Sequence, residues 1–123
     1  GRRQARASAY DRQRARLAPA LRPPQRVAGC TPAWHLYAVR VDFGGLGLPR
    51  EEVMRQLKVA GIGTQVHYIP VHTQPYYQDR VGALQLPGAM AYYRGTLSLP
   101  LFPSMSEADV TRVVDALAAC LGR

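Results

Sequence analysis

The alternation of side chains over residues 36–43 is the feature that most limits the folds open to this chain. Within TPAWHLYAVRVDF, residues 31–43, the pattern predicts an extended strand. Its apolar face carries Tyr37, Val39, Val41 and Phe43, and its opposite face carries Leu36, Ala38, Arg40 and Asp42. Because a strand with one apolar face must bury it against another layer, this strand requires a sheet covered by other elements.

With this strand included, the expected elements follow the order helix, strand, helix, strand, strand, helix. A thin apolar stripe predicts a helix over 2–18, and REEVMRQLKVAG predicts one over 50–61. Further strands are expected at 64–69 and 96–101, and residues 72–95 read as irregular or weakly helical. The fold class expected is therefore α+β: a small, mostly antiparallel sheet of three or four strands with helices packed on one face.

Two helices carry clear boundary signals. The helix over 50–61 has a predicted buried stripe of Val53, Leu57 and Ala60 and ends at glycine 61. The last helix begins at Ser106, a strong N-cap, with Asp109 three residues on as a capping-box partner. These signals mark the end of one helix and the start of the other, and the apolar stripe of the first is expected to face the sheet.

Charge divides the chain into two parts. Residues 1–26 carry eight arginines against one aspartate, whereas the remaining residues carry eight basic and seven acidic side chains. We interpret 1–26 as an arginine-rich, domain-linking helix with a proline-rich connector, and 27–123 as the small domain. An arginine arm that binds nucleic acid is an alternative, although no second basic patch or stacking platform supports it.

Composition excludes several other classes. No apolar run is long enough to cross a membrane, and two cysteines 90 positions apart, Cys30 and Cys120, indicate a reducing, cytoplasmic compartment. Chemistry that needs a Schiff-base lysine has only Lys58 available, on a charged helix face, so we expect such a lysine to lie outside these residues.

The stretch GIGTQVHYIPVH, residues 61–72, is the candidate site. A metal centre is not expected, because His67 and His72 have no nearby carboxylate or third histidine. The pattern leaves two readings open. The histidines could be surface or structural residues, or His72, at a strand end beside Gln74, could hydrogen-bond a polar ligand.

Two long runs carry a family resemblance: GIGTQVHYIPVHTQPYY at 61–77 and LPGAMAYYRGTLSLPLFPSMSEADVTRVVDAL at 86–117. They closely resemble the C-terminal end of DegT-type nucleotide-sugar aminotransferases, and in particular the transaminases that make 4-amino sugars in the pseudaminic-acid pathway. The resemblance covers residues 8–121. It implies the small C-terminal domain of a fold-type I aminotransferase that works as a homodimer.

The resemblance also implies what the chain does. In this family a large domain holds pyridoxal phosphate on a lysine, and an amino acid, usually glutamate, donates its amino group to a keto-sugar nucleotide. The lysine and the cofactor-binding groups belong to that large domain, so we expect this chain to be an inactive fragment by itself, with no catalytic and no cofactor-binding residue.

The small domain would supply substrate contacts. His72 matches the family histidine that reaches toward the substrate, with His67, Tyr68 and Gln74 as further candidates. A stand-alone α+β module that binds a small molecule without catalysis is the alternative function.

Overall fold

The structure, a computed structural model, describes residues 1–123 and contains an antiparallel sheet with the strand order β1-β2-β3. The strands are β1 (Leu21–Arg22), β2 (Tyr37–Val41) and β3 (Thr96–Leu99). The helices are α1 (Arg2–Gln13), α2 (Phe43–Leu46), α3 (Arg50–Val59), α4 (Pro75–Val81), α5 (Pro87–Gly95) and α6 (Glu107–Cys120). Two 3-10 turns, η1 (Arg14–Leu17) and η2 (Val71–Thr73), complete the chain.

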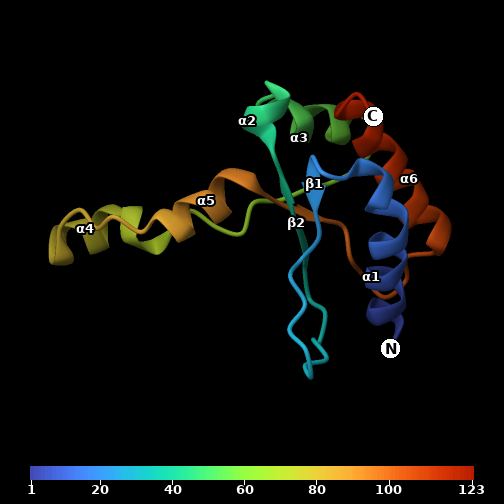
Figure 1. Ribbon diagram of the computed structural model, residues 1–123, viewed down its shortest axis with the longest axis horizontal. Coiled ribbons are helices and arrows are strands. Elements are labelled where there is room, and N and C mark those ends of the chain that lie inside the picture. The colour runs from blue at the N-terminus through green and yellow to red at the C-terminus, as the bar shows by residue number, and fades with distance from the viewer.

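One face of the sheet carries the core. The register places apolar side chains opposite one another on this face, in the pairs Tyr37–Leu99, Val39–Leu97 and Val41–Leu21. All of them are buried and form one cluster with side chains of α1, α3 and α6. Figure 1 shows α1 and α6 packed side by side next to the sheet, with both chain ends on this side. The predicted α+β fold, with helices on one face of a small antiparallel sheet, is confirmed.

A tyrosine pair joins α1 to the sheet. The rings of Tyr10 and Tyr37 stack with their centroids 4.7 Å apart. The Tyr10 hydroxyl donates to the carbonyl oxygen of Pro100 at 2.8 Å, and the Tyr37 hydroxyl donates to Asp11 at 2.7 Å. Burial raises the pKa of both phenols above the usual value, so both hydroxyls stay protonated and act as donors.

The arginines of the N-terminal segment largely have partners within the chain. Arg12 pairs with Glu107 at 2.8 Å, and Arg16 pairs with Asp115. Two carboxylates of α6 thus offset two of the arginine charges. Arg6 donates to the carbonyl oxygen of Met105. The apolar face of α1 lies in the same core as the rest of the chain. That this segment also joins a second domain stays a prediction.

The helix ends behave largely as their signals indicate. Ser106 accepts from the backbone of Asp109, and the Asp109 carboxylate accepts from the backbone of Ser106, which confirms the capping box. At the end of α3, Gly61 adopts φ +78°, and the amides of Gly61 and Ile62 donate to the carbonyls of Lys58 and Leu57. This turn buries Ile62, whereas Ala60, which we expected in the buried stripe, is exposed.

Two expected strands are shorter than the sequence suggests. The strand over 31–43 is reduced to Tyr37–Val41, because Asp42 accepts a hydrogen bond from the amide of Gly45 and so starts α2. The strand expected over 64–69 is wrong: only Gln65 forms a bridge, with Ser98. Beyond it the chain leaves the sheet, since Pro70 has no amide donor and no layer covers Ile69, which is exposed.

Residues 68–95 form an arm that projects from the body of the molecule (Figure 1). The arm contains η2, α4 and α5. Residues 72–95, expected to be irregular or weakly helical, thus contain two helices, and a proline in the first turn of each is a helix-start signal. Its apolar side chains are largely exposed; they are Tyr68, Ile69, Val71, Tyr76, Tyr77, Val81, Leu84, Leu86 and Tyr92. The arm thus exposes apolar side chains along its length, and no other part of this chain covers them.

Arg50 fixes the root of the arm. Its guanidinium donates to the carbonyl oxygens of Tyr93 and Thr96, and it lies over the Tyr93 ring, 4.8 Å from the ring centroid. One side chain of α3 therefore holds the last turn of α5 and the first residue of β3.

We expect Ser106→Ala to lower the free energy of unfolding by about 1 kcal/mol, because the N-cap acceptor is lost. Urea unfolding of the chain measures this, and Ser104→Ala, in an exposed residue outside the cap, is the control. The hydrogen bonds from Ser106 lower the pKa of Asp109, so the contribution of Asp109 is present above its ordinary pKa and is lost as the pH falls through the lowered value. Equal stabilities of both variants and the parent would contradict the capping role.

We expect Arg50→Met to loosen the root of the arm while the core stays folded. The amide of Thr96 donates to the carbonyl of Tyr92 and should exchange at least about tenfold faster, since charge-assisted bonds to the adjacent carbonyls are lost. Hydrogen exchange followed by NMR measures this rate. The matched control is Arg55→Met on the same helix, whose guanidinium binds only Glu52, and an equal effect of both changes would rule out the anchoring role.

Candidate functional site

The candidate site is a shallow groove on the arm. It has a volume of about 400 Å³, within the range of small-molecule sites. Its lining residues are Pro70, Val71, His72, Tyr77, Val81, Leu84, Leu86 and Ala89. They come from η2, α4, the connection to α5 and the start of α5, so the groove forms only where the chain folds back along the arm.

His72 is the polar group that the fold places in this groove. It lies in η2, between Val71 and Thr73, and is half-buried. Thr73 donates its hydroxyl to the carbonyl oxygen of Pro70 at 2.7 Å, which fixes the turn that carries the histidine. No side chain of this molecule hydrogen-bonds the His72 imidazole, so both ring nitrogens are available to a ligand.

His67 has a different environment. Its Nδ1 lies 2.8 Å from the hydroxyl of Ser98, which is buried in β3. The imidazole also contacts the edge of the Tyr68 ring, with the centroids 4.6 Å apart. His67 and Tyr68, both predicted site residues, thus lie at the edge of the sheet. Tyr68 is the first residue of the arm.

The other predicted residue is more peripheral. Gln74 precedes α4 as its N-cap, makes no capping hydrogen bond with its side chain, and does not line the groove. Tyr77, Leu84 and Leu86 do line it, although sequence reasoning did not select them. The proline-started helices were the available signal, since they indicate that apolar residues of 75–90 share helical faces.

The groove provides binding chemistry and no reactive group. Its walls are largely apolar, so they can contact the apolar parts of a ligand, and one imidazole can accept or donate a hydrogen bond beside them. No group of three histidine, cysteine or carboxylate side chains gathers as a metal centre. Both cysteines are free thiols, and none of the helices has the length and apolar character that a bilayer crossing needs.

Lys58 is the one lysine of this sequence, so it is the one side chain here that could hold a carbonyl cofactor as a Schiff base. It lies in the last turn of α3, is exposed, and does not line the groove. A lysine that forms a Schiff base needs a desolvated pocket or a neighbouring charge that lowers its pKa. The residues present here therefore do not fit the reactive end of such a cofactor.

Comparison with known proteins gives the fold and the groove a context. The model of the DegT/DnrJ/EryC1/StrS aminotransferase family matches residues 1–118. The spore coat polysaccharide biosynthesis protein SpsC of Bacillus subtilis (strain 168) is 51% identical over 88 residues, which are 69% of this chain and 23% of SpsC. The chain therefore spans about a quarter of that relative.

Solved structures agree with the family match. DesV of S. venezuelae, solved in complex with a ketimine intermediate, is 35% identical with a TM-score of 0.85, over 100% of this chain and 32% of DesV. The aminotransferase TlmJ of Streptoalloteichus hindustanus is 32% identical with a TM-score of 0.84, over 98% of this chain and 31% of TlmJ. Helicobacter pylori PseC, an aminotransferase of pseudaminic acid biosynthesis, shares the fold at 22% identity and a TM-score of 0.87, over 98% of this chain and 32% of PseC. The chain accordingly belongs to the DegT/DnrJ/EryC1/StrS aminotransferase family.

Proposed function

We propose that this chain is the small domain of a pyridoxal-phosphate-dependent nucleotide-sugar aminotransferase. The complete enzyme would transfer an amino group from an amino acid, with glutamate as the expected donor, to a keto-sugar nucleotide used for surface polysaccharide or glycan biosynthesis. The observation that carries the proposal is the position of His72: its imidazole forms no hydrogen bond within the chain and lines an apolar groove. The groove lies on an exposed arm of a chain that belongs to this family.

The groove's own residues define the part that this domain plays. The apolar wall of Val81, Leu84 and Leu86 would exclude water from the bound sugar nucleotide. The His72 imidazole would hydrogen-bond a polar group of the substrate and hold it in one orientation. Pyridoxal phosphate supplies the electron sink for amino transfer when it is bound, and we place its lysine outside these residues.

The exposed arm supports a partner surface in the same enzyme. Tyr76, Val81 and Leu84 are roughly half exposed, and an apolar surface of this kind on a soluble protein is typically covered by another domain or subunit. We assign this role to the large domain and its dimer partner. Arg12 and Arg16 pair with carboxylates of α6, which holds this face of the arginine-rich segment against the body of the domain and gives no support to a nucleic-acid arm.

We expect His72→Asn in the complete enzyme to lower kcat/KM for the keto-sugar nucleotide at least about tenfold, because a hydrogen bond in a desolvated groove is lost. The half-reaction with the amino-acid donor and the melting temperature should change little, since His72 bonds no side chain within the chain. Stopped-flow measurement of each half-reaction separates the two effects.

His35→Asn is the matched control, because this third histidine is exposed in the loop before β2. An unchanged kcat/KM for the sugar in the His72 variant would remove this residue from the site.

We expect the amides of residues 75–86 to be protected from hydrogen exchange in the complete protein. A helix of 7 residues such as α4 is too short to be stable in water, so slow exchange requires a surface that covers it. Mass spectrometry of the complete protein and of the 123-residue chain gives the comparison, with the amides of α6 as internal reference. Equally fast exchange in both would favour the stand-alone binding module.

A further inference from the structure

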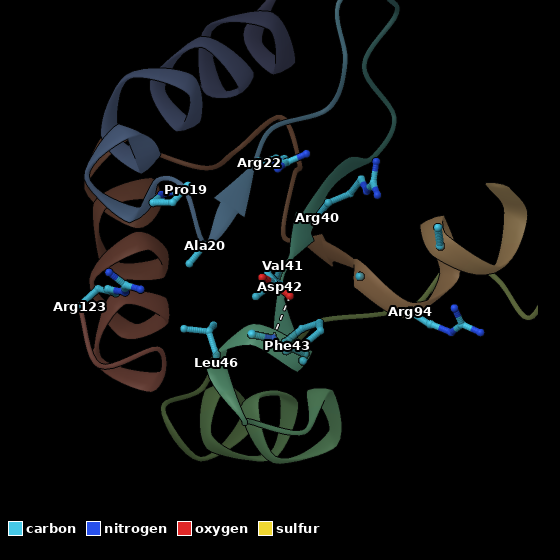
Figure 2. Close-up of a pocket in the computed structure, with 14 residues that line it drawn as sticks. Pro19, Ala20, Arg22, Arg40, Val41, Asp42, Phe43, Leu46, Arg94 and Arg123 are labelled. Carbon is cyan, nitrogen blue, oxygen red and sulfur yellow. Dashed lines mark hydrogen bonds between the residues drawn. The ribbon is translucent and has the colours of Figure 1, made fainter. Parts of the chain in front are cut away.

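A second and larger cavity lies at the opposite end of α5 from the groove. It has a volume of about 600 Å³ and opens between the first two strands, α2, the last turn of α5 and the C-terminus (Figure 2). Its lining includes the arginines Arg22, Arg40, Arg94 and Arg123. Four arginines from four separate segments thus line one cavity.

Two of these arginines lie directly opposite each other. The antiparallel register of β1 and β2 pairs Arg22 with Arg40, and both side chains are exposed (Figure 2). Directly opposed residues have Cβ atoms roughly 4.5–5.5 Å apart, and like charges at such positions are destabilising. An anion bound between them would attract both guanidinium groups and so offset their repulsion.

Close backbone packing sets the end of α5 beside β2. A Cβ on Gly95 would lie 3.1 Å from the carbonyl oxygen of Val41, so a glycine is what lets the end of α5 rest on β2. Arg94, the residue before it, lines the cavity at this junction, and its side chain extends away from Arg22 and Arg40 (Figure 2). Arg123 reaches the cavity from the other side, at the end of the chain.

None of the four guanidinium groups has a counter-charge. They take part in none of the ion pairs, and in none of the side-chain hydrogen bonds, of the molecule. The carboxylate in the lining, Asp42, accepts from the amide of Gly45 at 2.9 Å and serves as the cap of α2. By contrast, arginines elsewhere, such as Arg12, Arg55 and Arg112, bind carboxylates or carbonyl oxygens.

We propose that this cavity binds a small molecule that carries a phosphate monoester or diphosphate group. The guanidinium fork matches phosphate oxygens in a bidentate manner, and the opposed pair Arg22 and Arg40 offers two such forks. The volume exceeds that of one ion, and Phe43, Leu46 and Ala91 provide apolar wall for the rest of the ligand. The proposal does not depend on the transaminase reaction, since binding can be measured without turnover.

Titration calorimetry of the complete protein with inorganic pyrophosphate tests the site. We expect binding that weakens as sodium chloride is raised, because the contact is between exposed charges. Arg40→Gln and Arg22→Gln should each weaken it at least about tenfold. Arg2→Gln is the matched control, since Arg2 is an exposed arginine on α1 that forms no ion pair and lies outside the cavity, and it should leave the affinity unchanged.

Two sources of the phosphate group can then be separated. Competition of uridine diphosphate with pyrophosphate, lost in Arg40→Gln, would identify a nucleotide diphosphate as the ligand. Simultaneous binding of both would identify a separate phosphorylated effector. Absence of pyrophosphate binding by the parent protein, or equal affinities of the parent, Arg22→Gln and Arg40→Gln, would overturn the proposal. Its failure would leave the His72 experiment, and so the proposed function, unaffected.

Discussion

The stack of Tyr10 on Tyr37 is the contact on which the rest of this structure depends. It places an arginine-rich helix with little apolar surface of its own against the middle strand of the sheet. The two hydroxyls reach opposite ends of the arrangement, one at the carbonyl of Pro100 after β3 and one at Asp11 within α1. Because buried hydroxyls must find acceptors, these bonds fix how the helix and the strands are oriented.

This orientation gives the two faces of the sheet different roles. Helices α1, α3 and α6 cover one face completely, and stability resides there. The other face carries Arg40, Thr96 and Ser98, and from its edge the chain leaves to form the arm. Binding features therefore gather away from the core: the groove with His72 at one end of α5 and the arginine cavity at the other. His72, Arg22 and Arg40 form no ion pair and no side-chain hydrogen bond within the chain, so they differ from the core residues that line the arginine cavity.

The fold was predictable where local chemistry and burial agree. The alternation around Val39 and the Ser106 cap are both local signals that the core reinforces. The strand over 64–69 failed because an apolar run needs a covering layer, and none exists there. The sequence pattern left the role of His72 open and the family resemblance selected it; the structure places it in the groove, and its contact with a substrate stays a prediction. The arginine cavity was not predictable from the sequence, since the pairing of Arg22 with Arg40 depends on a two-residue strand that carries no pattern of its own.

The direct passage of α5 into β3 has a mechanical consequence. Gly95 ends the helix and Thr96 begins the strand, with no linking residue between them, and Arg50 clasps the carbonyls on both sides of the junction. The arm has no hinge at this point, so it cannot swing as an independent flap. At this junction the last turn of α5 and the first residue of β3 are therefore expected to move as one unit.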